Sequence, residues 1–376
     1  MKNFIDFIIK TLIFIIIFLA IVFFATIFYS YMCDNDNLSI GNAISYVQSI
    51  GNNIIDEFKP TNKHVINIAL DDTTISSSQT SLSYNEYDKN TYYYNQLDNN
   101  AKKIYDSLKD NINNLKKENF TIDFEKQFND LLHDPSGQES LNTSFQSALD
   151  AFFYDYPELF YIDLTKISLL IKSTSIGPLT TYTVKIAPDN TNNYLHKEFN
   201  SEEKVNNAIS KVENIKNHII NNLPNSNDYD KLLTIHDTLV KSLEYDSSLN
   251  KSNTHNIYGA LIEKSVVCEG YAKSFKYILD SLNIENILVS GTATNSSGDS
   301  ESHMWNYIKL NDNWYAVDVT WDDPIIIGGF SKDNLRHDYF LKGNTTFNTS
   351  HIPSGKISDN GITFTLPNLS TTNYKK

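Results

Sequence analysis

Cysteine is scarce in this chain, which has two of them, Cys33 and Cys268, among 376 residues. A disulfide framework is therefore improbable. No Cys–Cys or Cys–His spacing resembles a structural zinc site, and the acidic loops lack the glycine-centred pattern of an EF-hand. We expect no metal ion and no other cofactor.

Basic residues are also in short supply. Lys and Arg number 31 against 45 Asp and Glu, which gives a net charge of -14. No basic stripe is available to neutralise phosphates, so the composition argues against nucleic acid and anionic membrane surfaces as partners. With 40% hydrophobic residues, most of the chain can fold around a core, as two domains or as one domain with a large appendage.

Residues 11–31 form one long apolar run without a charge. About 20 such residues cross a bilayer core of roughly 30 Å as a helix. Lysines precede the run and aspartates follow it, so the positive-inside rule places the N-terminus in the cytoplasm. We expect a single-pass anchor in the cell membrane, with the C-terminal domain outside the cell.

Two alternatives to the anchor remain open. A cleaved signal peptide would have a shorter apolar core, and residues 29–32 offer no small-x-small cleavage site. A lipoprotein modified at Cys33 would need a small residue where Met32 stands.

Composition and periodicity divide the chain into four parts. We predict a cytoplasmic start with the transmembrane helix (1–33), an extracytoplasmic stalk or linker (34–100), an accessory α+β region (101–224) and a C-terminal domain (225–376). The accessory region shows apolar helical spacing at residues 101–108 and 144–156 and strand alternation at 180–186. It carries no recognisable chemistry, so we expect it to support a cleft.

One segment changes from strand-like to helical residues at a cysteine. Val266 and Val267 are β-branched, whereas apolar residues recur at helical spacing from Tyr271 to Leu282, after Cys268. A cysteine in the first turn of a helix meets unpaired N–H groups and the positive end of the helix dipole. Both favour the thiolate, which is the nucleophile. The alternative is a small buried hydrophobic residue.

Residues 303–310 and 314–321 form the clearest hairpin pattern in the chain, with a turn at 311–313. A two-residue turn would set Asp318 opposite Trp305 or Tyr307, on the same sheet face as His303 and one or two diagonal steps from it. A three-residue turn would put them on opposite faces.

Given the two-residue turn, the Asp318 carboxylate can accept from one imidazole nitrogen of His303 and leave the other for the Cys268 thiol. Such a Cys–His–Asp arrangement activates a nucleophile for acyl transfer. Each residue also has a plainer interpretation: Asp318 as a partner of backbone N–H groups, His303 as a strand end, or all three as ligands of a metal. His236, beside the apolar stripe of a helix at 228–245, is expected to be structural.

Four motifs, in this order and spacing, resemble the transglutaminase-like superfamily in its bacterial form. They are Tyr258-Gly259-Ala260-Leu261, VCEGYAKSF at 267–275, His303-Met304-Trp305-Asn306 and WYAVDVTWDDP at 314–324. The resemblance covers about residues 228–325. It extends more loosely to residues 338–341, to His351 and to residues 157–160.

The resemblance implies an α+β, papain-like core in which a helix with cysteine at its N-terminus packs on an antiparallel sheet. Cys268 would be the nucleophile, His303 the general base and acid, and Asp318 the residue that orients the imidazole. The Cys268 backbone N–H and an upstream aromatic residue, for which Tyr258 is the candidate, would hold the oxyanion, and Trp305 could line the substrate channel. Animal members bind calcium, but no matching acidic site is found here.

The expected activity is that of a cell-surface thiol acyltransferase or hydrolase acting on protein or peptide amides, with cell-wall peptides as candidate substrates. Crosslinking, deamidation and proteolysis share the same triad, so the sequence leaves the three open. The alternative is a catalytically silent surface module with a binding or structural role.

Overall fold

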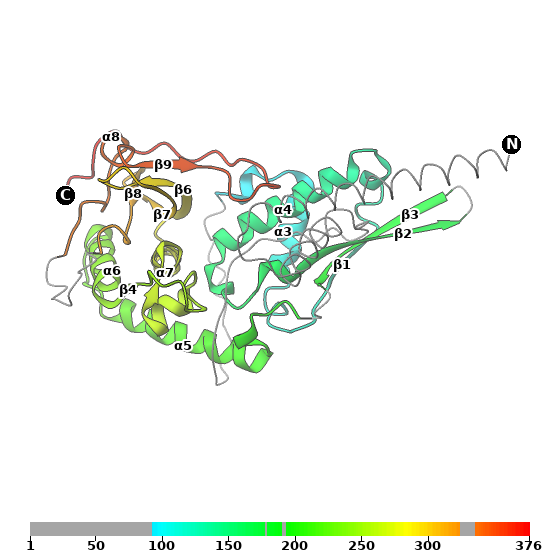
Figure 1. Cartoon of the computed structure of the whole chain (residues 1–376), viewed down its shortest axis with the longest axis horizontal. Helices are drawn as coiled ribbons and strands as arrows, with labels where there is room; N and C mark the ends of the chain where they lie inside the picture. The colour runs from blue at the N-terminus through cyan, green and yellow to red at the C-terminus, as the bar shows by residue number, and fades with distance from the viewer. Residues whose placement is uncertain (1–91, 177–178, 190–192, 324–334) are drawn as a thin grey trace, which may run out of the picture. The chain divides into compact units, whose positions relative to one another are not determined.

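The computed structural model describes residues 92–176, 179–189, 193–323 and 335–376 (Figure 1). All of these described residues belong to one compact unit. Among the described residues, no helix is both long enough and apolar enough to cross a membrane. The predicted anchor at 11–31 and most of the predicted linker lie outside the described residues, so the predicted division into four parts stays a prediction.

The accessory region combines two helices with a three-stranded antiparallel sheet. Helices α3 (Asn99–Asp110) and α4 (Gly137–Asp155) pack together, and the sheet has the order β1-β3-β2. The strands are β1 (Ile122–Glu125), β2 (Ile167–Ile176) and β3 (Leu179–Pro188), and β2 and β3 form the long hairpin in Figure 1. Short 3-10 helices connect these elements: η1 (Tyr94–Gln96), η2 (Leu131–His133), η3 (Pro157–Leu159), η4 (Leu164–Lys166) and η5 (Lys197–Phe199).

The helical periodicity of the accessory region is confirmed. The buried residues of α3 are those at the predicted spacing, Ala101, Ile104, Tyr105 and Leu108. Helix α4 ends before Pro157, as predicted, because the residue before proline disfavours the helical conformation. It begins earlier than predicted, at Gly137, since its first turns are polar and do not show the apolar spacing.

The second half of the described chain contains the helices α5 (Glu202–Asn221), α6 (Asp228–Ser242) and α7 (Cys268–Asp280). The side chain of Asn227 accepts from Asp230 N at 3.0 Å and is the N-cap of α6. A parallel pair, β4 (Glu244–Tyr245) and β5 (Ser265–Val266), and a π-helical segment, η6 (Gly259–Glu263), lie between α6 and α7.

A four-stranded antiparallel sheet with the order β8-β7-β6-β9 completes the fold. Its strands are β6 (Asn286–Thr294), β7 (Ser300–Leu310), β8 (Asn313–Val317) and β9 (His351–Ser354), with the short helix α8 (Asn344–Phe347) before β9. Helix α7 packs on β6 and β7, and Asn306 Nδ2 donates to Ala272 O at 3.0 Å. The predicted arrangement of a cysteine-bearing helix on an antiparallel sheet is thus present.

The β7–β8 turn has two residues, which confirms the alternative that brings His303 and Asp318 to one face. Leu310 pairs with Asn313, while Asn311 and Asp312 have φ angles of 49° and 61°. Two consecutive residues with positive φ are typical of a type I′ turn, whose twist matches that of a hairpin.

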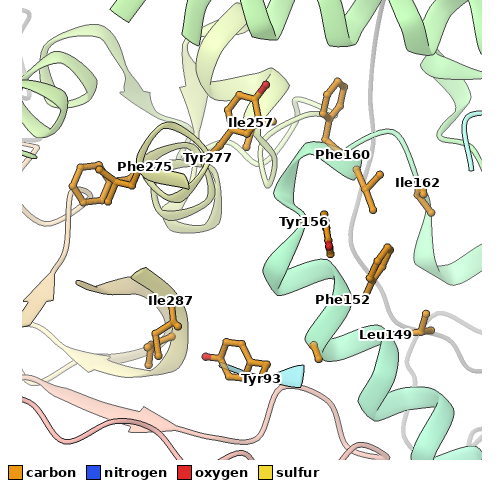
Figure 2. Close-up of a cluster of buried hydrophobic side chains, with 14 of the residues drawn as sticks. Tyr93, Leu149, Phe152, Tyr156, Phe160, Ile162, Ile257, Phe275, Tyr277 and Ile287 are labelled. Atoms are coloured by element: carbon orange, nitrogen blue, oxygen red, sulfur yellow. The ribbon is translucent and has the colours of Figure 1, made fainter. Parts of the chain in front are cut away.

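The accessory region and the second half of the chain share one continuous core. Phe152 of α4, Phe275 of α7 and Ile287 of β6 belong to the same buried cluster (Figure 2). Tyr93 is also buried, and its hydroxyl donates to Leu288 O in β6. Residues at the end of the predicted linker therefore pack on the core.

Candidate active site

Cys268 is the first residue of α7, as the sequence predicts. The preceding Val267 is the N-cap and makes no side-chain hydrogen bond to the first N–H groups of the helix. The helix can begin here because residue 270 is glycine. A Cβ at Gly270 would lie 2.4 Å from Val266 Cβ, closer than two carbons can pack, so any larger residue would push α7 away from β5.

His303 comes from β7 and is 3% exposed. Its Nε2 donates to Asp318 Oδ2 at 2.7 Å. Within the described part of the chain, its Nδ1 has no hydrogen-bond partner of good geometry. The Cys268 side chain does interact with the ring, since it contributes to the raised pKa of His303. Nδ1 is therefore the nitrogen left for the thiol.

The electrostatics of the pair favour the charged forms of both partners. Burial alone would lower the pKa of His303, but the Asp318 carboxylate and Cys268 outweigh it and raise that pKa to about 10. Burial would likewise raise the pKa of Asp318, but the two histidines beside it, His303 and His351, bring it well below its usual range. At neutral pH the site thus holds an imidazolium next to a carboxylate.

Asp318 is fully buried and accepts four hydrogen bonds. Oδ1 takes the backbone N–H groups of Thr320 at 2.9 Å and Trp321 at 3.2 Å. Oδ2 takes His303 Nε2 and also His351 Nε2, the latter at 3.1 Å. The predicted plainer role, as a partner of backbone N–H groups, is therefore fulfilled by the same carboxylate that holds the histidine.

His351 is the residue of this site that the sequence did not point out by its chemistry. It begins β9, is fully buried and follows Asp318 by 33 positions. Its ring stacks on Phe347, with the ring centroids 4.1 Å apart, and its Nδ1 lies 2.9 Å from Ser350 Oγ. In the sequence, His351 was singled out only because the looser part of the family resemblance extends to it.

A cavity of about 550 Å³ opens at the thiol. It is lined by Cys268 and His303 and by Tyr154, Tyr245 and Leu249, among others. Burial is the main reason why the pKa of Tyr245 rises to about 12, and the charge of Cys268 adds to it. The phenol of Tyr245 therefore stays protonated at neutral pH and can donate a hydrogen bond beside the thiol.

Tyr258 and Trp305 do not line this cavity. Tyr258 is 2% exposed and packs between the rings of Phe160 and Phe199, which does not suit the oxyanion role predicted for it. Trp305 is fully buried, with its ring centroid 6.0 Å from that of His303, so it packs beside the imidazole. Tyr245, which does line the cavity, lies in a polar connection of the sequence that showed no pattern pointing to it.

The elements and site described above define a class: a mixed α/β domain in which a helix N-terminal cysteine meets a histidine held by a buried aspartate. Residues 203–319 match the family model of the transglutaminase-like superfamily. The chain thus contains a transglutaminase-like domain, as the resemblance of its motifs predicted.

Similar proteins carry related names. The kyphoscoliosis peptidase of Mus musculus is 28% identical over 99 residues, which span 24% of this chain and 15% of the mouse protein. A solved structure described as a TGase covers 45% of this chain and 48% of its own, with 12% identity and a TM-score of 0.28. A putative cysteine protease from Cytophaga hutchinsonii covers 40% of this chain and 62% of its own, with 17% identity and a TM-score of 0.25. The chain spans less than two thirds of the length of each of these proteins.

Proposed function

We propose that this chain is a thiol acyltransferase or hydrolase that acts on protein or peptide amides through an acyl-enzyme on Cys268. One observation carries the proposal: Cys268 and His303 line the same cavity, and His303 is held by Asp318 through the nitrogen that does not serve the thiol. The transglutaminase-like domain supports the same class of reaction.

In the first half of the proposed reaction, Cys268 Sγ attacks the carbonyl carbon of an amide. The carbon–nitrogen bond then breaks, and the imidazolium of His303 gives its Nδ1 proton to the leaving amine. A thioester remains on Cys268. The Cys268 backbone N–H, at the start of α7, and the Tyr245 hydroxyl are our candidates for stabilising the oxyanion.

In the second half, His303 removes a proton from the incoming acceptor, which attacks the thioester. A lysine amine as acceptor yields an isopeptide crosslink, and water yields deamidation or hydrolysis. We propose a protein or peptide acceptor at the cell surface, because residues 11–31 have the length and flanking charges of an anchor that places the domain outside.

The proposal is tested by trapping the acyl-enzyme. The other cysteine, Cys33, would also react with thiol probes, so the parent protein carries Cys33→Ala. A peptide library with glutamine and ester substrates is added, and intact-protein mass spectrometry reads the acyl adduct. We expect an adduct in the parent, none in Cys268→Ala, and strongly reduced formation in His303→Gln.

An adduct of equal yield in Cys268→Ala would refute the assignment of Cys268 as the nucleophile. A parent that forms no adduct with any substrate, yet binds cell-wall material, would favour the silent binding module instead. Release of the full chain from membranes by carbonate wash would contradict the anchored location without touching the chemistry.

A further inference from the structure

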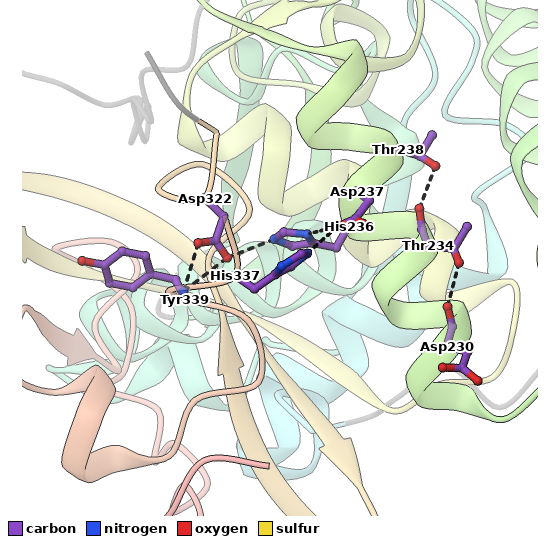
Figure 3. Close-up of polar contacts among 8 residues, drawn as sticks. All are labelled: Asp230, Thr234, His236, Asp237, Thr238, Asp322, His337 and Tyr339. Carbon is purple, nitrogen blue, oxygen red and sulfur yellow. Dashed lines mark hydrogen bonds and ion pairs between the residues drawn. The ribbon is translucent and has the colours of Figure 1, made fainter. Parts of the chain in front are cut away.

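A second group of histidine and carboxylate side chains lies outside the cavity, where α6 meets the segment after residue 334. We name it the α6 cluster: His236 and Asp237 from α6 and His337 from that segment, with Asp322 behind His236. Figure 3 shows the His236 ring between Asp237 and Asp322, with His337 beside it.

The ligand atoms of the α6 cluster converge. Asp237 Oδ1 lies 3.1 Å from His236 Nδ1 and 2.7 Å from His337 Nε2. One nitrogen from each histidine and one oxygen of Asp237 all lie within 4.8 Å of one another. The two rings are tilted by 39° with centroids 5.3 Å apart, so both rings approach the same point without stacking on each other.

Asp322 determines which nitrogen of His236 carries the proton. It is fully buried, and its Oδ2 lies 3.1 Å from His236 Nε2. Both Asp322 oxygens also accept from Tyr339 N, at 3.0 and 3.2 Å, which fixes the carboxylate in place. A carboxylate that accepts a hydrogen bond from one imidazole nitrogen keeps the proton on that nitrogen. The lone pair of the other nitrogen is then free for a metal ion, as in carboxylate–histidine–zinc sites.

We propose that His236 Nδ1, Asp237 Oδ1 and His337 Nε2 bind a divalent transition-metal ion, with Asp322 orienting His236. Two imidazoles and one carboxylate suit Zn²⁺ best, with a water molecule in the fourth position. Without the ion, a proton has to lie between Asp237 Oδ1 and each of the two histidine nitrogens; the bound ion replaces these protons.

Two of the three ligand-atom pairs need only a small adjustment to receive the ion, and the third pair, the two histidine nitrogens, lies within 4.8 Å. Zinc–ligand distances of about 2.0–2.1 Å set neighbouring ligand atoms of a tetrahedral site roughly 3.3 Å apart. The present contacts of 3.1 and 2.7 Å are shorter, so the His337 ring has to withdraw by about half an ångström. The His337 side chain is 40% exposed, which leaves it room to move and gives the ion a path of entry.

The other His–Asp–His group, formed by His303, Asp318 and His351, is a less suitable metal site. All three residues are buried, and Asp318 already accepts two backbone hydrogen bonds besides those of the two histidines. An ion there would have to displace the hydrogen bonds that the two histidines give to Asp318. The two groups thus make a matched pair for a binding experiment.

Occupation of the α6 cluster would connect α6 to the loop that follows Asp318. Asp322 N donates to Asp318 O at 3.3 Å, and Asp323 accepts from Tyr271 of α7 at 2.6 Å. We therefore assign the ion a structural role, that of stabilising the loop of residues 318–323 and the segment that follows residue 334.

The proposal is tested by titrating Zn²⁺ into the metal-free full chain carrying Cys33→Ala and Cys268→Ala, so that no thiol competes. A chromophoric chelator reports free metal, and thermal unfolding is followed with and without Zn²⁺. We expect one equivalent bound and a higher Tm. His337→Ala, a change at a half-exposed side chain that should leave the fold intact, should weaken binding by at least about tenfold and abolish the Tm shift.

Two control variants separate the sites. His351→Gln, in the buried group, and His218→Ala, at an exposed histidine of α5, should leave Zn²⁺ affinity unchanged. The visible spectrum of bound Co²⁺ should show a four- or five-coordinate site in the parent and lose that signature in His337→Ala. Unchanged affinity in both His337→Ala and Asp237→Asn, loss of binding in His351→Gln, or no binding at micromolar Zn²⁺ would each overturn the proposal.

Discussion

At the scale of the residue, the Asp318 carboxylate connects two histidines that belong to different strands. Its Oδ2 accepts from His303 of β7 at 2.7 Å and from His351 of β9 at 3.1 Å. A buried carboxylate with a missing donor is costly, because its desolvation is then no longer balanced by a hydrogen bond. The orientation of the His303 ring therefore depends on Asp318 directly and on His351 through that carboxylate.

Replacing His351 by leucine should slow acyl-enzyme formation by about ten- to a hundredfold, because a hydrogen bond to a charged group contributes about 1.5–3 kcal/mol. His351→Gln keeps an N–H donor and should recover most of the rate. The measurement is the second-order rate of Cys268 acylation against pH in the Cys33→Ala background. Equal rates for leucine and glutamine would show that His351 only fills space.

The stability of the protein should depend on pH through His303. Its pKa is raised to about 10 in the folded protein, against about 6.5 in an unfolded chain. The stabilisation is therefore complete below about pH 6.5 and is lost as the pH rises towards 10. The free energy of unfolding of the wild type should fall, relative to that of His303→Gln, between about pH 7 and 10.

Urea unfolding of both proteins at several pH values checks this. The glutamine retains a donor for Asp318, so the difference between the two curves isolates the titration of the imidazole. Parallel curves across this range would contradict the raised pKa of His303.

At the scale of the element, α7 is placed by its contact with β5. Gly270 allows the helix to begin against Val266, and Asn306 Nδ2 of β7 donates to Ala272 O, which holds the helix on the sheet. A shift of this helix moves Cys268 relative to His303, since the two residues sit on different elements. Changes in packing at the start of α7 should therefore affect the reactivity of the Cys268 thiol more than the stability of the protein.

Gly270→Ala should reduce the alkylation rate of Cys268 by more than about tenfold and destabilise the protein by about 1–3 kcal/mol, the usual cost of overpacking. The control is Gly298→Ala in an exposed loop, where a φ of 92° makes the change unfavourable although no atom lies within 4 Å. That variant should lose stability and keep the alkylation rate. A Gly270→Ala protein that reacts at the wild-type rate would contradict this account of the helix position.

At the scale of the whole molecule, the accessory region and the transglutaminase-like domain share a single buried cluster that contains Phe152 and Phe275. Polar contacts join the same parts, such as Ser358 Oγ to Asp150 Oδ2 at 2.7 Å. Elements that share a core are expected to unfold together.

Phe152→Ala in α4 and Phe275→Ala in α7 should each cost about 3–5 kcal/mol and lower the midpoint of one common transition. Calorimetry, together with far-UV circular dichroism and tryptophan fluorescence, checks this. All three tryptophans lie at or after residue 305, so fluorescence reports the second half of the chain alone. Two separate transitions, each moved by one variant only, would show that the two regions fold independently.

The sequence by itself determined the features that depend on neighbours along the chain. Helical spacing placed Cys268 at the start of α7. Strand alternation put His303 and Asp318 on one face for a two-residue turn, the alternative that the structure then confirmed at Asn311 and Asp312. These relations follow from backbone periodicity, which acts over a few residues. The Cys268, His303 and Asp318 assignment could therefore be predicted, and their catalytic roles stay predictions for the experiments above.

Only the tertiary structure decided which distant faces meet. It brought His351 to Asp318, set Tyr245 rather than Tyr258 in the cavity, buried Tyr93 and joined His236 to Asp322. Each of these contacts depends on how side-chain volumes fill the space between elements, and no periodicity in the chain encodes that fit. A lone tyrosine or histidine looks the same in the sequence whether packing brings it to the reacting atoms or buries it elsewhere.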